Sequence, residues 1–572
     1  MKILNQEAKS LMSSISKEQR KNIELAIIKI AKKHVISGVC LYGSKVAGYA
    51  RSNSDFDVII VLEDYAYVLK YVYLKESEIE LSALVVDRKS LERDANSAFL
   101  GEFVIGRLLH IYESLINPEL FRKLEVVYKK RVILEEISDM VRSTNILCTE
   151  LTFPLEYIMF SKIRRRSILY PNALYSYSKI YTGRNSQHNI EFALNGYRQA
   201  LKDILEEDDH LLILRSNGNL VQISERRVDV QRSKKIASLK LTKRMQEFAS
   251  YFIHAYAGRH TLQYIIKEAE AKINRHKKYP VELPKFISNP KEYYWKLPEG
   301  FLITDDKNWL DAYAESKGLF EYAISSKHKL GSMRSSTGSF TLIDLNDGSR
   351  QKTIVVKEFA KSKAVRWTDL KIWPAYYQRI GKYRIDPLFR LGNEYKALRY
   401  IRLLGLNSPI VESVVLGKKM LITEFIEGKL ISDIIKNCLK NNNTEGLDWI
   451  KVAGEGFAII HAEGSTLGNI KPHDLIISKD TLYITGIEQF GFKSGDPVLD
   501  IIHFVSEGLK RTRNTVIAKQ ITKQFLYGYS KETTVDYIKK LINAKYYGEL
   551  FYPLLTPAVA QTIKKELSTF TQ

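Results

Sequence analysis

The segment LYGSKVAGYARSNSDFDVIIVL, residues 41–62, decides the fold of the N-terminal part of the chain. A strand ends at Gly43 and Ser44, a polar turn follows, and Asp55 and Asp57 open the next strand. Residues two apart in a strand project to the same face, so the two carboxylates form a pair at a strand edge. Such a pair suits a hard cation such as Mg²⁺. The glycine lets backbone approach a triphosphate closely, and the serine hydroxyl can bond a phosphate oxygen.

The residues around this segment predict a compact α/β unit. We expect helices over residues 1–35, 64–75 and 90–145, and strands over 39–43, 56–62 and 78–86.

The pattern of Gly-Ser, a spacer with glycine, and Asp-x-Asp resembles the nucleotidyltransferase superfamily of DNA polymerase beta. That superfamily includes CCA-adding enzymes, poly(A) polymerases and antibiotic-modifying transferases. The resemblance is clear over residues 40–90 and implies Mg²⁺-dependent transfer of a nucleotidyl group from ATP or another NTP to a hydroxyl. It also implies a third metal-binding carboxylate, which could help to deprotonate the acceptor. Glu80 is our candidate, with Glu78 and Asp87 as rivals.

A second constellation lies in the C-terminal half. A loop of small residues within 330–344 precedes a strand over 353–360 that carries Lys357. Glu394 lies on a later helix and could pair with this lysine, which would contact phosphate. The order of these features resembles the N-lobe of protein-kinase-like enzymes.

The resemblance continues over residues 320–510 and is closest to archaeal kinases related to the small kinase of the KEOPS complex and to the archaeal tRNA kinase. This chain departs from their pattern, because Asn469 replaces the catalytic Asp and Gly486 replaces the Asp that binds the nucleotide's metal. An amide cannot accept a proton from an attacking hydroxyl. Asp474 replaces a metal-binding Asn and could still hold Mg²⁺. We therefore expect a pseudokinase, and a kinase rescued by Asp474 and Glu488 is the alternative.

The charge of the chain predicts a polyanionic partner. Its 572 residues include 87 Lys and Arg against 65 Asp and Glu, a formal net charge of +22, which favours RNA. The segment 161–180 interleaves arginine with tyrosine, and further basic residues follow over 226–244. A tyrosine-rich helical core with an ordinary basic exterior is the alternative. The candidate RNA-binding residues are Arg164, Arg165, Arg166, Arg226, Arg227, Lys234 and Lys235.

Together these features predict a multidomain protein of α/β and α+β parts. The expected parts are a nucleotidyltransferase domain over 1–145, a helical basic domain over 146–280, a proline-containing linker over 281–318, and a kinase-like N-lobe over 319–425 with a C-lobe over 426–572.

The expected function is nucleotidyl transfer to RNA, with tRNA favoured. An RNA or protein kinase with a non-catalytic N-terminal domain and a non-catalytic RNA-binding scaffold are the alternatives.

The three cysteines have no zinc-ligand spacing, and the chain shows neither a signal peptide nor an apolar run long enough for a membrane span. We therefore expect a cytoplasmic protein.

Overall fold

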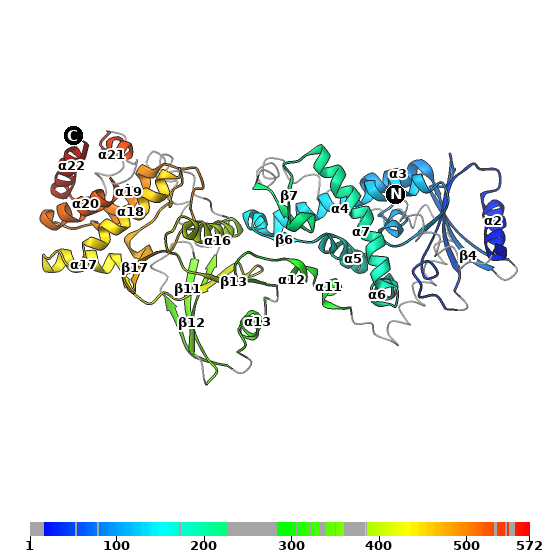
Figure 1. Cartoon of the computed structure of the whole chain (residues 1–572), viewed down its shortest axis with the longest axis horizontal. Helices are drawn as coiled ribbons and strands as arrows, with labels where there is room; N and C mark the ends of the chain where they lie inside the picture. Colours follow the sequence, from blue (N-terminus) through cyan, green and yellow to red (C-terminus); the bar gives the residue numbers. More distant parts are fainter. Residues whose placement is uncertain are drawn as a thin grey trace. The chain divides into compact units, whose positions relative to one another are not determined.

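The structure is a computed structural model that divides into two compact units, and Figure 1 shows its elements. Unit 1 comprises Met1–Arg142 and Thr152–Trp295, and unit 2 comprises Ser143–Leu151 and Lys296–Gln572. The residues described are 17–51, 54–76, 79–170, 173–225, 283–304, 306–319, 322–330, 338–348, 351–359, 384, 386–530, 535–543, 546–547 and 555–571.

Unit 1 is built on a five-stranded mixed sheet of order β3-β4-β2-β1-β5. The strands are β1 (Ile36–Tyr42), β2 (Phe56–Leu62), β3 (Leu69–Glu76), β4 (Ile79–Asp87) and β5 (Glu113–Ile116). The pair β2 and β4 is parallel, and the other pairs are antiparallel. The inner strands are almost continuously buried because helices α2 (Lys17–Ala31) and α3 (Arg88–Ser97) pack against them.

Strand β3 corrects the predicted helix over 64–75. Its sequence, LKYVYLKE, contains two tyrosines and a valine, which are residue types enriched in strands. It pairs with β4 at the edge of the sheet, where one face of the strand stays exposed. The other strands predicted in this region are confirmed within three residues at each end.

Helices and short strands complete unit 1. The elements are η2 (Ile105–Leu109), α4 (Pro118–Thr144), β6 (Thr152–Phe153), α5 (Leu155–Leu169), α6 (Leu174–Thr182), α7 (Ser186–Glu207), β7 (Leu212–Arg215), η5 (Ser216–Gly218), β8 (Leu220–Ile223), α11 (Lys285–Ser288) and α12 (Pro290–Tyr294). Strands β7 and β8 pair as an antiparallel hairpin. The described helices of the predicted middle domain thus share one unit with the N-terminal sheet.

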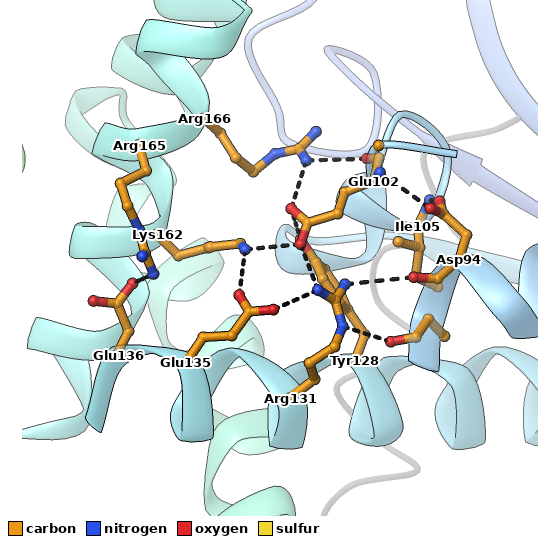
Figure 2. Close-up of polar contacts among 12 residues, drawn as sticks. Asp94, Glu102, Ile105, Tyr128, Arg131, Glu135, Glu136, Lys162, Arg165 and Arg166 are labelled. Carbon is orange, nitrogen blue, oxygen red and sulfur yellow. Dashed lines mark hydrogen bonds and ion pairs between the residues drawn. The ribbon is translucent and has the colours of Figure 1, made fainter. Parts of the chain in front are cut away.

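A buried network of charges joins α4 and α5 to the loop before η2 (Figure 2). Glu102 is 1% exposed and lies at its centre. Its Oε1 accepts from Lys162 Nζ at 2.8 Å and lies 2.9 Å from Arg131 Nη1. Its Oε2 accepts from Tyr128 at 3.0 Å and from Arg166 Nη1 at 3.2 Å. Although burial alone would raise the pKa of this carboxyl, the three cations lower it, so Glu102 is ionised and holds both helices.

Unit 2 begins with a six-stranded sheet of order β10-β11-β12-β14-β13-β9. The strands are β9 (Phe301–Ile303), β10 (Ala323–Leu330), β11 (Gly338–Asn346), β12 (Gln351–Phe359), β13 (Val411–Val415) and β14 (Met420–Glu424). Its core includes Ile343, Ile354 and Ile422 from the strands and Tyr313 from α13 (Trp309–Ser316). Strand β12 confirms the strand predicted over 353–360.

Regular elements occupy much of the predicted linker over 281–318. Helices α11 and α12, strand β9 and helix α13 all lie within it. The prolines do not prevent this, because Pro290 stands at the start of α12, where a missing backbone N–H costs no hydrogen bond.

Helix α16 (Pro387–Leu403) lies between β12 and β13 in the chain and packs on η3 (Asn145–Thr149). A side chain at Gly392 would collide with the backbone of Leu147, so the glycine lets the two helices approach closely.

The remaining elements are β15 (Lys429–Leu430), α17 (Ile431–Asn441), α18 (Asp448–Ala462), η8 (Pro472–Asp474), β16 (Leu475–Ser478), β17 (Thr481–Ile484), α19 (Pro497–Gly508), α20 (Thr515–Tyr529), α21 (Val535–Leu541) and α22 (Pro557–Thr571). Among the described helices, none combines the length and the apolar composition that crossing a bilayer requires.

The network around Glu102 gives a first prediction. We expect Glu102→Gln to lower the free energy of unfolding by about 3 kcal/mol, because it leaves buried cations without their counterion. Glu206→Gln is the matched control, since Glu206 faces Lys202 on the exposed surface of α7. Chemical denaturation of both variants measures the difference, and equal losses would contradict a stabilising role for the network.

Candidate functional site

The turn after β1 brings glycine backbone against a carboxylate. Gly43 has a φ of +80°, a left-handed conformation that side chains disfavour. A Cβ at this position would overlap the carboxylate of Asp57, so glycine is required by space as well as by conformation. The turn is closed by backbone bonds from Ala47 N to Gly43 O and from Tyr49 N to Ser44 O, both at 3.0 Å. The predicted phosphate-binding turn therefore lies directly beside the predicted metal-binding carboxylate.

The second carboxylate is fixed from the neighbouring strand. Asp57 on β2 is in register with Ser82 on β4, and the two strands run parallel. The hydroxyl of Ser82 donates to Oδ2 of Asp55, which orients this carboxylate at the start of β2. Asp55 and Asp57 are two residues apart, as predicted, and both line one cavity.

The cavity has a volume of about 240 Å³ and is lined by residues from the sheet, from η2 and from α6. Gly43, Ser44, Asp55 and Asp57 all contribute to it. Its aromatic lining comprises Tyr42, Tyr49, Tyr71, Phe103, Tyr170, Tyr175 and Tyr177. The structure thus brings four of the predicted site residues together in a single hollow with a largely aromatic wall.

Four nitrogen-containing side chains that the sequence did not single out for this site also line the cavity. Arg51 comes from the segment between β1 and β2. Arg107 and His110 come from η2 and the residue after it, and Arg166 comes from α5. Burial lowers the pKa of His110 well below its ordinary value, and the charges of Arg166 and Arg107 lower it further. The imidazole is therefore neutral at pH 7 and accepts or donates one hydrogen bond to the hydroxyl of Tyr181 at 2.6 Å. No local motif marks these residues, because loop and helix meet only in the folded chain.

Glu80 does not join the two aspartates. It pairs across the sheet with Lys75 on β3, whose Nζ lies 2.6 Å from Oε1, and accepts from Tyr73 at 2.8 Å. These two hydrogen bonds lower the pKa of Glu80. Its side chain is 36% exposed and is not part of the cavity lining. The prediction that Glu80 completes the site is therefore not supported by its position.

The rivals for the third carboxylate have other positions. Asp87 caps α3, where it accepts from the backbone N–H of Ser90 at 2.9 Å. Glu78 lies outside the described residues. At the place on β4 that faces Asp57, the chain has Ser82, so the described part of the cavity contains two carboxylates.

Two carboxylates fit a Mg²⁺ ion. This cation is commonly held by one or two protein carboxylates, with the other positions taken by water and substrate phosphates. Among the described residues no group of three or more His, Cys, Asp and Glu side chains could hold a metal. Asp55 and Asp57 would therefore hold the ion together with the nucleotide, and the space kept open by Gly43 adjoins the carboxylate of Asp57.

The predicted RNA-binding arginines of α5 have three different environments. Arg164 is exposed. Arg165 is partly buried and pairs with Glu136 and with Asp139, the latter at 2.6 Å. Arg166 is 3% exposed, so the expectation that it contacts RNA on the surface is wrong. The other candidates, Arg226, Arg227, Lys234 and Lys235, lie outside the described residues.

In unit 2, Lys357 and Glu394 pair as predicted. Lys357 on β12 donates to Glu394 on α16, and its Nζ also lies 3.0 Å from Oε2 of Glu488. Oε1 of Glu488 lies 3.4 Å from Arg390. Burial alone would lower the pKa of Lys357, but the two carboxylates raise it above its ordinary value. Two cations and two carboxylates thus form a buried, electrically balanced quartet.

Two of the departures from the kinase pattern, Gly486 and Asp474, lie close together. Gly486 has a φ of +69°, and a Cβ there would lie 2.5 Å from Oδ1 of Asp474. Asp474 accepts from the backbone N–H of Lys471 at 3.0 Å. Burial raises the pKa of Asp474 to about 7. Asn469 is half-buried and has a positive φ of 43°. The glycine thus leaves room for the Asp474 carboxyl where a side chain would collide with it.

Comparison with known proteins identifies part of unit 1. Residues 26–113 match the family model described as Polymerase beta, Nucleotidyltransferase. The matched stretch contains β1, β2 and β4 with Gly43, Asp55 and Asp57. No match to a curated protein was found. The match supports a transferase at the level of nucleotidyl transfer, and it confirms to that extent the resemblance found in the sequence.

The contact of Gly43 with Asp57 gives a second prediction. Gly43→Ala should lower the free energy of unfolding by more than Gly218→Ala does. We expect Gly218→Ala to cost about 1–2 kcal/mol, because the backbone at this position is left-handed. Gly218 also has a positive φ, of 87°, but no atom lies within 4 Å of its missing Cβ. Chemical denaturation of the two variants isolates the collision with the carboxylate. Equal losses would mean that Asp57 moves aside freely.

The raised pKa of Asp474 gives a third prediction. Its folded-state value of about 7 lies above the value of about 3.9 for an unfolded chain, so ionisation destabilises the folded state as pH rises through this range. Asp474→Asn cannot ionise, and the melting temperature of this variant minus that of the wild type should increase from pH 4.5 to pH 8. Asp433→Asn, at an exposed position, should show no such trend. A difference that is constant with pH would contradict the prediction.

Proposed function

We propose that unit 1 transfers a nucleotidyl group from ATP or another NTP to a hydroxyl of an acceptor, with release of pyrophosphate. The observation that carries this proposal is the contact between the Gly43 turn and the Asp57 carboxylate, with Asp55 held beside it by Ser82 in the same cavity. A phosphate-binding turn and a cation-binding pair must adjoin for this chemistry, because the reacting phosphorus lies between them.

Each residue has a distinct part in the proposed reaction. Asp55 and Asp57 would hold Mg²⁺, which when bound supplies charge stabilisation to the phosphates and lowers the pKa of the attacking hydroxyl. The backbone at Gly43 and the hydroxyl of Ser44 would bind phosphate oxygens. Tyrosine side chains of the cavity offer aromatic faces on which a nucleobase can stack.

We propose RNA as the acceptor, with tRNA favoured. The support is the net charge of +22 and the exposed position of Arg164 near the end of α5. The buried position of Arg166 and the ion pairs of Arg165 leave fewer free cations on this helix than the sequence indicated.

For unit 2 we propose a kinase-like module without phosphoryl transfer, which binds a nucleotide or RNA. The support is the quartet around Lys357, in which two carboxylates already satisfy the ammonium group. A phosphate would have to displace Glu488 to reach it. An amide at Asn469 and a glycine at Gly486 also remove two acidic groups that the transfer of a phosphoryl group requires.

Labelled nucleotides test the transferase. With α-labelled NTP, Mg²⁺ and total small RNA, we expect label on RNA, and Asp55→Asn or Asp57→Asn should reduce it roughly 100-fold or more. Glu80→Gln is the control for a carboxylate outside the cavity and should retain most of the activity. Loss of transfer in Glu80→Gln as severe as in the aspartate variants would restore Glu80 as the third carboxylate.

The γ-label tests unit 2 in the same reaction. We expect no transfer of γ-label to RNA or protein. Transfer that disappears in Lys357→Ala and survives in Asp55→Asn would establish an active kinase instead. Salt-sensitive RNA binding without transfer of either label would favour a non-catalytic scaffold.

A further inference from the structure

We propose that Arg107 and Arg166 form an arginine pair that binds the polyphosphate chain of the nucleotide in the unit 1 cavity. This inference rests on the proposed nucleotidyl transfer and names the side chains that hold the part of the substrate released as pyrophosphate.

Arg107 is a buried cation that interacts electrostatically with Asp57 but has an unused hydrogen-bond donor. Its guanidinium lies 5.4 Å from the ring centroid of Tyr42 and 5.5 Å from that of Phe103. Its Nε is buried and has no hydrogen-bond partner, and its side chain makes no ion pair in the part of the chain that the structure describes. An unsatisfied buried polar group is unfavourable, and more so when it is charged. A bound anion would supply the missing acceptors.

Arg166 is held rigidly but has donors to spare. Its Nη1 donates to the backbone oxygen of Glu102 at 3.0 Å and to the carboxylate, as Figure 2 shows, and its Nε donates to Tyr177 at 3.3 Å. Its Nη2 has no partner among the described residues. A guanidinium fixed on one side and open on the other is preorganised to receive phosphate oxygens.

One turn of backbone places both arginines. The guanidinium of Arg166 lies against Gly106, where any Cβ would overlap it. Gly106 directly precedes Arg107 in η2. The glycine that leaves space for the guanidinium of Arg166 is therefore adjacent in the chain to Arg107. Both arginines line the same cavity as His110, and their charges both lower the pKa of its imidazole, after the larger effect of burial.

The charges of the cavity favour a polyphosphate over a single phosphate. Asp55 and Asp57 provide a place suited to a cation, the arginine pair provides a place suited to an anion, and both pairs line the same cavity. A ligand that satisfies both places must carry several negative charges along its length and must also bind Mg²⁺. A triphosphate has both properties, whereas a nucleoside has neither.

Calorimetric titration of the full chain tests the arginine pair directly. Inorganic tripolyphosphate and ATP, each with Mg²⁺, should bind Arg107→Gln about tenfold more weakly or worse than the wild type, since charged hydrogen bonds are lost. The melting temperature of this variant should change little, because Arg107 gives up its contacts with aromatic rings but no hydrogen bond within the described protein. Adenosine affinity should be unchanged. Arg20→Gln removes an equal charge from the exposed surface of α2 and should bind all three probes normally.

A second variant addresses the other arginine. Arg166→Lys keeps a cation beside Glu102 but loses the planar fork, so tripolyphosphate binding should weaken while most of the stability remains. Unchanged tripolyphosphate affinity in Arg107→Gln would overturn the inference, and so would an equal loss of adenosine affinity. If the arginine variants lose tripolyphosphate binding but no α-label is ever transferred, the arginine pair stands and the proposed transferase activity fails.

Discussion

The ionised carboxylate of Glu102 is the constraint on which unit 1 depends. A carboxylate buried to this degree is unfavourable unless cations surround it, and its cations come from two different helices. Arg131 belongs to α4, and Lys162 and Arg166 belong to α5. The loop that carries Glu102 leads directly into η2, which lines the cavity. The charge requirement of one residue therefore joins the sheet to the helices and makes the helices part of the site.

The two units differ in whether a buried cation is paired directly with carboxylates. In unit 2, Lys357 is matched by Glu394 and Glu488, and the cluster has no need of a ligand. In unit 1, Arg107 lies in the cavity with aromatic rings beside it and no carboxylate bonded to it. A satisfied quartet stabilises a resting structure, whereas an unsatisfied cation lowers stability and is suited to a ligand that brings negative charge. This difference in electrostatics is consistent with the two proposals, nucleotidyl transfer in unit 1 and no phosphoryl transfer in unit 2.

The sequence predicted the parts of the site that are local. Gly43, Asp55 and Asp57 lie within fifteen residues, and their spacing alone places them at one strand edge. Glu80 lies on the strand predicted for it, but its partners were not foreseen because the segment 64–75 was predicted to be a helix. That segment is the strand that supplies Lys75 and Tyr73 as partners of Glu80.

Long-range contacts account for most of what the sequence did not reveal. Three successive arginines at 164–166 look alike in the sequence, yet a helix turns each of them toward a different environment. Arg107 meets Arg166 only after α5 has docked on the loop of Glu102. The pairing of Lys357 with Glu394 was predictable because an ordered series of features surrounds it, whereas the part of Glu488 in the quartet depends on tertiary folding.

The chain passes between its units three times, at 142–143, 151–152 and 295–296, and this affects the timing of its folding. Segment 143–151 is completed by the ribosome long before the helix it packs on, since Asn145 and Glu150 bond to Asp386 and Arg399, more than 240 residues later. At about 5–20 residues per second, the segment waits roughly 10 to 50 s for α16. Unit 2 therefore cannot complete its fold until synthesis is well advanced, whereas the sheet of unit 1 is available from the start.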